Sequence, residues 1–179
     1  GSLDAGNAAA STIYNVFAVA DDDATTFTGI CSTATPAVGP AGVTYFRYLG
    51  SFYNNSSDNI EVFYWSGNGS TIKINYDDVY AAELIMYNAA AAAFSDVACA
   101  PVVPLTATMV DMQILNAAGQ VSLRCNGSAA AAGLFQGNGG YDIIVDFPVD
   151  ATQKFECKTT AGTVTVWIKG YTFTRYTIK

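Results

Sequence analysis

The chain has 179 residues and a formal net charge of −7, with 8 Lys and Arg against 15 Asp and Glu. So few cations argue against a nucleic-acid ligand, which proteins bind with clustered Lys and Arg, and against an anionic membrane surface as a partner. The chain contains no His, which excludes Ser-His-Asp and Cys-His nucleophile systems and His-ligated metal sites.

The ends and the apolar runs of the chain bear on its organisation. No apolar run approaches the roughly 20 residues of a membrane-spanning helix, so no membrane insertion is expected. No charged region precedes an apolar one at the start, so no secretory signal is expected. Gly1-Ser2 is typical of a cloning scar. We expect residues 3–179 to form a single β-sandwich domain excised from a longer protein, and a sub-boundary, if there is one, to fall near 78–93.

Strand signals dominate the first half. Tyr and Phe number 11 and 10 in the whole chain, and turn residues recur about every 8–12 positions, which is typical of a sandwich. Strands are predicted over residues 13–20, 27–32, 43–53, 60–66 and 71–76. Gly50 predicts a break or bulge in the third of these. The Asn-Gly pair within 67–70 favours a hairpin between the last two.

The second half repeats the theme. An alanine-rich linker is predicted over 88–93 and a stiff crossover at Pro101 and Pro104. Turn residues at 116–119 predict a second hairpin, and 129–132 with 137–140 a loose loop. Strands are predicted over 82–88, 94–100, 106–115, 120–125, 141–147, 154–158 and 163–176. The predicted fold class is therefore all-β, as a two-sheet antiparallel jelly-roll-like sandwich.

The four cysteines are Cys31, Cys99, Cys125 and Cys157, with no CxxC pair among them. An even count permits two disulfides in three connectivities. The wide spacing instead favours four small core-filling thiols, because a chain of this length builds a core without cross-links.

One stretch carries a family resemblance. Tyr45–Ile60 reads YFRYLGSFYNNSSDNI, in which an Arg-Tyr-Leu-Gly strand leads into an Asn/Ser/Asp turn and an Asn-Ile strand. This stretch resembles a module of tail fibres and tailspikes of tailed bacteriophages. Further stretches that look like parts of the module are Leu3–Gly6, Ala10–Val19, Pro40–Gly50, Asn59–Phe63, Phe94–Leu105 and Val166–Phe173.

The resemblance implies a β-sandwich at the distal or C-terminal end of a homotrimeric fibre, in a virion tail made in bacterial cytoplasm. It implies attachment to a bacterial surface, often to a glycan, or a stabilising cap on the fibre. It supplies no catalytic residue set. Because the module varies in its exposed loops, no binding residue can be transferred by position.

Aromatic residues are the informative feature for binding. Tyr and Trp present an apolar ring face and a polar tip, which suits contact with the C–H faces of sugars and also subunit interfaces. Strand alternation places Phe63 and Trp65 on one face and Tyr64 on the other. The candidate glycan-binding residues are Trp65, Tyr64, Tyr53 and Trp167. Ordinary core positions and a trimer interface remain the two alternatives for each of them.

Charged residues give weaker signals. Asp21, Asp22 and Asp23 are weak candidates for a cation site, since Ca²⁺ prefers clustered oxygens, but their spacing matches no calcium loop and a solvated loop tip is the alternative. No metal and no cofactor are predicted. Arg47 lies within an aromatic strand, so we expect a structural anchor, stacked on Tyr48 or paired with a carboxylate.

An enzyme is not expected, because no catalytic motif is present and His is missing as a general base. Acidic pairs are the first place to look if the chain cuts polysaccharides, and they would be drawn from Asp111, Asp142, Asp146 and Glu156. The sequence thus predicts a homotrimeric domain that binds a bacterial surface glycan. The alternatives are a trimerisation or folding cap without a ligand, and a fragment of a polysaccharide depolymerase.

Overall fold

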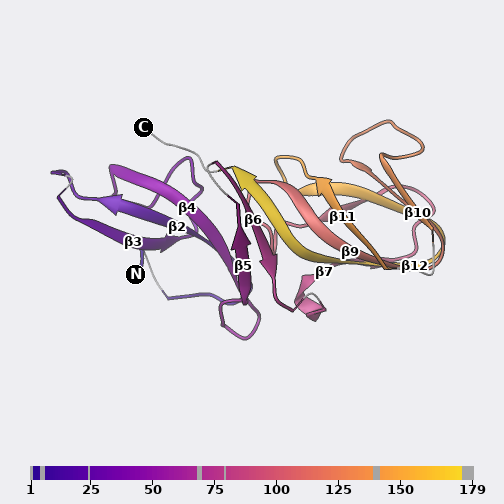
Figure 1. Ribbon diagram of the computed structural model, residues 1–179, viewed down its shortest axis with the longest axis horizontal. Coiled ribbons are helices and arrows are strands. Elements are labelled where there is room, and N and C mark those ends of the chain that lie inside the picture. The colour runs from indigo at the N-terminus through magenta and orange to yellow at the C-terminus, as the bar shows by residue number, and fades with distance from the viewer. Residues whose placement is uncertain are drawn as a thin grey trace.

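The computed structural model describes residues 2–4, 7–23, 25–67, 70–78, 80–138 and 142–174. The strands form two sheets in a curled, sandwich-like arrangement, which confirms the all-β prediction (Figure 1). The smaller sheet has the order β1-β3-β2-β4, in which only the short β1–β3 pair is parallel. Its strands are β1 (Ser2–Leu3), β2 (Thr12–Ala20), β3 (Phe27–Ser32) and β4 (Tyr45–Asn54).

The larger sheet has eight strands, and its central pair is β9 and β12. Around this pair, β10 and β11 lie beside β9, whereas β6, β7 and β8 lie beside β12, and β5 pairs with β6. The strands are β5 (Phe63–Ser66), β6 (Thr71–Tyr76), β7 (Ile85–Ala89), β8 (Ser95–Ala98), β9 (Ala107–Cys125), β10 (Phe135–Asn138), β11 (Asp142–Pro148) and β12 (Lys154–Thr174).

The predicted hairpin at 116–119 is wrong. Residues 107–125 form one strand of 19 residues, paired along its length with the 21 residues of β12. The turn-forming residues instead make irregular pairings, because Ala161 faces Ala118 while the register shifts on either side. Gly119 and Gly162 take φ values of 78° and 73° there. Bulges of this kind bend a strand without ending it.

The bend lets the long ribbon fold over on itself into two layers. Phe147, at the end of β11, lies beside the first half of β9, since it pairs with Val110. Phe155 begins β12 and pairs with Cys125 at the far end of β9. Their rings nevertheless meet, with centroids 5.8 Å apart. The two halves of the ribbon therefore face each other across a core, as in sandwiches whose strands pass from one layer to the other.

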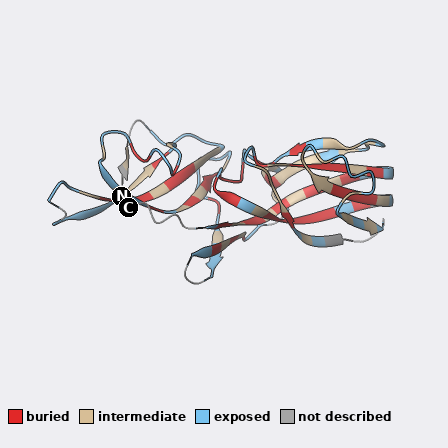
Figure 2. Ribbon diagram, turned by 90° about the horizontal axis from the view of Figure 1, so that it is seen from above, coloured by how far each residue is buried: buried red, intermediate tan, exposed pale blue. Residues whose placement is uncertain are grey.

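Burial follows the alternation of the long strands. Val164, Val166 and Ile168 are fully buried on one face of β12. Val121 and Leu123 are buried in the same way on β9. In Figure 2 the buried stretches run through the eight-stranded sheet and reach into the four-stranded one. Burying these aliphatic side chains contributes about 1.5–3 kcal/mol each relative to exposure, so this core is the main source of stability.

The two sheets are joined by a buried aromatic and polar cluster. Tyr48 of β4 packs on Phe173 of β12, with ring centroids 5.6 Å apart. The Tyr171 hydroxyl donates to the Ser51 carbonyl (2.8 Å), and Ser51 Oγ donates to Asn15 Oδ1 (2.5 Å). A buried polar cluster of this kind holds two sheets in one relative position only when each of its polar groups has a hydrogen-bond partner.

Several smaller predictions can now be compared with the structure. The strands predicted in the first half are present, although the one predicted over 60–66 begins at Phe63. Residues 82–88 form a short 3₁₀ turn (η1, Ala82–Leu84) followed by β7. The chain changes sheets between β4 and β5, whereas β7, within 78–93, pairs with β12.

Two predicted loops and the thiols complete this comparison. The loop predicted over 137–140 is wrong for its first two residues, because β10 pairs with β9 there. Residues 139–140, like positions 68 and 69 of the first hairpin turn, lie outside the described residues. All four cysteines are free, as predicted, but only Cys99 and Cys157 fill the core, whereas Cys31 and Cys125 are half-buried. Burial raises the pKa of Cys99 and of Cys157 to about 12. No helix in the described part of the chain has the length and apolarity to cross a membrane.

Candidate functional site

The four-stranded sheet has one face in the core and one in solvent. Along β2, Phe17 and Val19 are buried, and their alternates Ala18 and Ala20 point the opposite way. Along β4, Tyr48 is buried, whereas Tyr45 and Arg47 are exposed. We call the face that carries Ala18, Ala20, Tyr45 and Arg47 the outer face.

The outer face is hollow because its middle strand carries only small residues. Ala20 lies between Tyr45 of β4 and Phe27 of β3, and Ala18 lies between Arg47 and Gly29 in the same two strands. Large side chains therefore flank a floor of alanine. The resulting hollow, which we call the trough, measures about 450 Å³ and is lined by Ala18, Ala20, Phe27, Tyr45, Phe46, Arg47 and Leu49.

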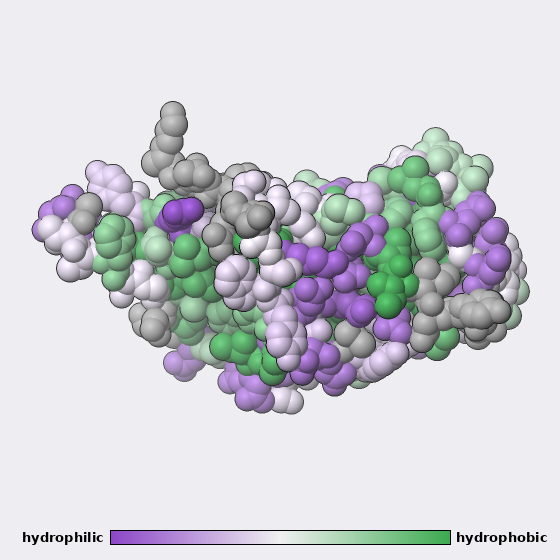
Figure 3. All heavy atoms as spheres, viewed as in Figure 1, coloured by the Kyte–Doolittle hydropathy of each residue, from purple (hydrophilic) through white to green (hydrophobic). Residues whose placement is uncertain are grey.

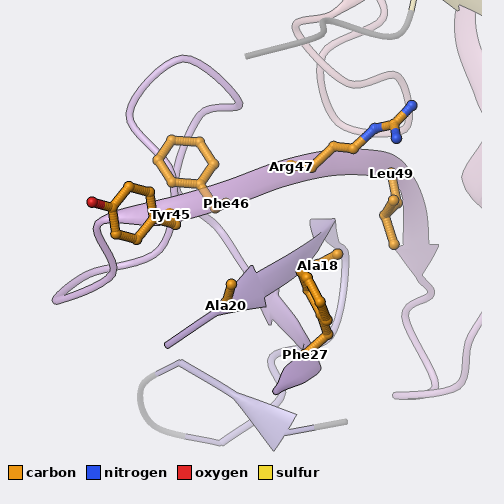
Figure 4. Close-up of a pocket in the computed structure, with 7 residues that line it drawn as sticks. All are labelled: Ala18, Ala20, Phe27, Tyr45, Phe46, Arg47 and Leu49. Atoms are coloured by element: carbon orange, nitrogen blue, oxygen red, sulfur yellow. The ribbon is translucent and has the colours of Figure 1, made fainter. Parts of the chain in front are cut away.

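The trough exposes apolar rings to solvent. Phe27 is 74% exposed and Tyr45 is 55% exposed. In Figure 4, Tyr45 lies at one end of β4, and Leu49 and the Arg47 guanidinium lie toward the other end. Phe27 and the two alanines lie below β4 in this view, on the neighbouring strands. Exposed apolar side chains that gather in one hollow are typical of binding surfaces, so the trough is the candidate site.

A bulge at Leu49 links the trough to a second hollow. Val16 pairs with Gly50 and Phe17 with Tyr48, so Leu49 is the extra residue in β4. Leu49 lines the trough and also a hollow of about 260 Å³ on the side of β5 and β6. We call this second space the Trp65 hollow. It is lined by Val16, Leu49, Gly50, Ser51, Phe52, Phe63, Trp65, Ile72, Ile74 and Phe173.

Trp65, one of the candidate glycan-binding residues, lines this second hollow. Its ring is 62% exposed and shares the Trp65 hollow with Phe63, two positions earlier on the same face of β5. Tyr64, also 62% exposed, lies on the opposite face of that strand. The structure thus brings Trp65, but not Tyr64, to the surface that carries the trough.

The other two candidate aromatics differ from the prediction. Tyr53 is only 2% exposed and belongs to the core, so the prediction that it contacts a glycan is wrong, because its β4 position alternates with Phe52 toward the interior. Burial also raises the pKa of its hydroxyl. Trp167 is half-buried, with its ring edge-on to Tyr80 at 5.7 Å. The Tyr80 hydroxyl accepts a hydrogen bond from Gln113 Nε2 (2.8 Å), so this cluster lies apart from the trough.

The described cations differ in their partners. Lys73, Arg124 and Lys154 each form an ion pair with a carboxylate. Lys158 instead donates to a backbone carbonyl and lies over an aromatic ring, and Lys169, like Arg47, forms no ion pair with a described residue. The exposed Arg47 guanidinium makes no hydrogen bond, ion pair or ring contact with any residue that the structure describes. The expected anchor for Arg47 therefore stays a prediction.

The three aspartates at 21–23 serve the turn between β2 and β3. Asp21 accepts hydrogen bonds from the backbone and the hydroxyl of Thr26, and these bonds lower its pKa. Asp23 Oδ1 accepts from Thr25 N (3.0 Å) and Thr25 Oγ1 (2.7 Å). Within the described ranges no group of three or more acidic, His or Cys side chains could hold a metal ion, so the cation site is not formed there.

Of the acidic residues considered for catalysis, two come together. Asp111 and Asp146 are cross-strand neighbours on β9 and β11, and Lys73 Nζ lies 3.2 Å from one and 3.1 Å from the other. Glu156 pairs with Arg124 and accepts from Gly127 N (2.9 Å). The side chain of Asp142 lies outside the described residues. Asp111, Asp146 and Glu156 are therefore each held by a cation. Figure 3 shows hydrophilic side chains gathered near the middle of the face that it draws.

Sequence reasoning missed the trough itself. Phe27 received no role, although its exposure is the largest among the exposed hydrophobic residues. The available signal was the alternation of Ala18 and Ala20 with Phe17 and Val19, which gives one face of β2 no bulk. Recognising a hollow required knowing that β3 and β4 flank this strand, and that pairing is non-local.

Comparison with known proteins adds no relative. No protein-family model matches the chain, and neither the curated proteins nor the solved structures contain a match.

Proposed function

We propose that this chain is an attachment domain that binds a bacterial surface glycan through the trough, within a homotrimeric bacteriophage tail fibre or tailspike. The observation that carries the proposal is the open hollow between Phe27, Tyr45, Arg47 and Leu49. The phage setting comes from the resemblance of Tyr45–Ile60, and that stretch includes the whole β4 wall of the trough.

The chemistry of the trough suits a sugar. Sugar rings have C–H faces that pack on aromatic rings and hydroxyls that need hydrogen-bond partners. Phe27 and Tyr45 offer exposed ring surface, and the Tyr45 hydroxyl and the Arg47 guanidinium offer polar groups. A volume of about 450 Å³ falls within the range of small-ligand sites.

The small residues at the bottom of the trough also leave room for a ligand to approach the sheet closely. A Cβ built at Gly29 would meet nothing within 4 Å, so the surface beside Ala18 is open. Filling it should block a ligand without disturbing the core. Gly29 lies outside the left-handed region, so a larger side chain causes no backbone strain there.

The test is binding of bacterial surface polysaccharides to the whole protein, by glycan array and calorimetry. Tyr45→Ala and Phe27→Ala should each weaken binding on the order of tenfold, and Gly29→Leu should block it. Tyr64→Ala is the matched control, because Tyr64 is a similarly exposed aromatic on the opposite face of β5. Equal binding by the Tyr45→Ala, Phe27→Ala and control variants would overturn the proposal for this surface.

A structural cap without a ligand is the second candidate, favoured by apolar side chains away from the trough. Val62, Leu134 and Ile144 are 58%, 66% and 62% exposed. Exposed apolar residues of this kind are covered in oligomers. Sedimentation of the protein would support the cap if it gave a trimer whose assembly needs Ile144 and if no polysaccharide bound.

A further inference from the structure

We propose that the ligand is an acidic glycan, extended along β4, whose sugar carboxylate pairs with Arg47 while neighbouring sugar units lie on Tyr45 and on Trp65. This inference rests on the proposed function and adds the class of glycan. It uses the position of Arg47, which has no described ion pair, on the wall of the trough, and the continuity of the two hollows at Leu49.

The protein as a whole is acidic. With a net charge of −7, the chain has acidic partners in excess for its few cations. Lys73, Arg124 and Lys154 each pair with a carboxylate. Arg47, like Lys169, forms no ion pair with a described residue, but of these two only Arg47 lines a hollow, on a defined strand between Phe46 and Tyr48.

An unpaired Arg on the wall of an aromatic hollow is suited to one kind of group. The guanidinium presents two parallel N–H donors that match the two oxygens of a carboxylate. No described acidic residue lines the trough or the Trp65 hollow, so no carboxylate of their lining competes for this bond. Uronic acids and other sugar acids place such a carboxylate on a ring whose remaining surface is C–H and hydroxyl.

The two hollows follow β4 over several residues. Tyr45, Arg47 and Leu49 occupy alternate positions of β4, and Gly50 and Phe52 continue the same face after the bulge. At about 3.3 Å per residue, the stretch from Tyr45 to Gly50 spans roughly 16 Å. In Figure 4 the guanidinium lies at the Leu49 end of the trough, which is the end shared with the Trp65 hollow. A chain of several sugars, rather than a single terminal sugar, fits a surface of this length.

Trp65 lies in the second hollow, beyond the Leu49 end of the trough. Its ring is 62% exposed, although Phe63 and Ile74 beside it belong to the packed interior or its margin. A Trp left open at the mouth of an apolar hollow can stack on a sugar ring in the way proposed for Tyr45. The carboxylate at Arg47 would then lie between two stacked units.

The test measures binding of uronic-acid-containing bacterial capsular polysaccharides to the intact protein, each in its native form and after reduction of its carboxylates to primary alcohols. Neutral dextran and neutral capsular polysaccharides complete the panel. We expect a native acidic polymer to bind, carboxyl reduction to weaken that binding about tenfold or more, and Arg47→Gln to have a similar effect. Arg47→Gln should bind the native and the reduced polymer alike.

Lys169→Gln is the matched control, because it removes one positive charge from β12, away from both hollows. It should leave affinity within about twofold, since an exposed charge at a distance is screened by salt. Arg47→Lys should restore only part of the affinity because the ammonium cannot bind a carboxylate in bidentate fashion.

A spectroscopic readout reports on the extension. The chain has two Trp, so Trp167→Phe leaves Trp65 as the only indole. Native polymer should shift and quench the fluorescence of Trp65, and a single uronic acid should not.

The outcomes separate the two proposals. Binding of neutral or carboxyl-reduced glycans as tight as that of native acidic ones, with Tyr45→Ala still harmful, would overturn the acidic class and leave the glycan function standing. Equal loss in Lys169→Gln and Arg47→Gln would overturn the role of Arg47. No binding of any glycan would overturn both proposals.

Discussion

The ring of Tyr48 in the four-stranded sheet meets the ring of Phe173 in the eight-stranded sheet at 63°, with centroids 5.6 Å apart. The Tyr48 hydroxyl also lies 2.6 Å from Ser51 Oγ and 3.0 Å from Thr106 Oγ1. One side chain thus supplies aromatic packing and a buried polar link between the sheets. Since Arg47 and Leu49 flank Tyr48, the same contact fixes the wall of the trough.

The first prediction concerns this link. Tyr48→Phe keeps the ring but removes the hydroxyl that Thr106 Oγ1 contacts, and it leaves Ser51 Oγ with its hydrogen bond to Asn15 alone. We expect a loss of about 1–3 kcal/mol in the free energy of unfolding, because an unsatisfied buried polar group costs its desolvation. Urea denaturation followed by circular dichroism measures this loss.

Tyr64→Phe serves as the control, because Tyr64 is exposed and its substitution should change stability by less than about 0.5 kcal/mol. Equal stability of Tyr48→Phe and Tyr64→Phe would mean that the polar link contributes nothing.

The second prediction concerns the bend in the long ribbon. Gly119 has φ 78°, and a Cβ there would lie 2.7 Å from Ala161 N of the facing strand. Gly119→Ala should therefore destabilise by about 2 kcal/mol or more, since it adds backbone strain to a clash with main-chain atoms. Thermal unfolding measures the shift.

Gly42 separates the two causes. It has a similar φ of 73°, but a Cβ there would meet nothing within 4 Å. Gly42→Ala should cost only the backbone preference, about 1 kcal/mol. If both alanine variants lost the same stability, the close approach of β9 and β12 at the bend would be ruled out.

This bend also explains what sequence reasoning could and could not predict. Asn116 and Gly119 are turn formers, so a hairpin was the natural local interpretation. The strand continues because Ala118 pairs with Ala161, far along the chain, and this pairing outweighs the local preference. The alternation of apolar and polar residues predicts the buried face correctly where one face of a strand lies in the core, as for Val164, Val166 and Ile168.

The site was predictable only in part. Exposure of Trp65 follows from its position on β5, a short strand at the edge of the eight-stranded sheet. Nothing local distinguishes it from Tyr53, which is buried in the core on the inner face of β4. Predicting the trough requires the pairing register of β2, β3 and β4, which a single sequence does not reveal.

The third prediction concerns acid stability. Burial raises the pKa of Asp150, but hydrogen bonds from the Asn126 side chain, Lys154 N and Thr152 outweigh it and lower that pKa to about 2. The unfolded value is about 3.9. A lowered folded-state pKa means that Asp150 stabilises the fold above about pH 4 and loses this contribution as the pH falls toward 2.

Asp150→Asn should therefore unfold at lower urea concentration than wild type at pH 6, and the difference should shrink between pH 4 and pH 2. The control is Asp22→Asn, an exposed carboxylate in the turn after β2. A difference that stays constant with pH would show that the Asp150 carboxylate is not preferentially stabilised in the folded state.

The fourth prediction concerns the carboxylates on β9 and β11. Burial lowers the pKa of Lys73, but its hydrogen bonds with Asp146 and Asp111 outweigh this and raise it. Lys73→Met leaves the two carboxylates facing each other, and like charges directly opposite destabilise a sheet. We expect a loss of roughly 1 kcal/mol at pH 7, smaller in high salt because Lys73 is partly exposed.

Adding Asp146→Asn to Lys73→Met should restore most of that loss, because it removes the repulsion. Lys154→Met is the comparison, since Lys154 pairs with the exposed Asp96 alone, and should cost less than about 0.5 kcal/mol. A double variant as unstable as Lys73→Met would contradict the electrostatic explanation and point to lost packing of the Lys73 stem.

The most direct test of the glycan site is a nuclear magnetic resonance titration of the isotope-labelled protein with a bound polysaccharide fragment. The account predicts that shifted amides lie in β2, β3 and β4 around Ala18, Phe27 and Arg47, with a second group at Trp65, while β10 and β11 stay unchanged. Shifts confined to the strands around Trp167 and Tyr64, with the trough unaffected, would contradict it.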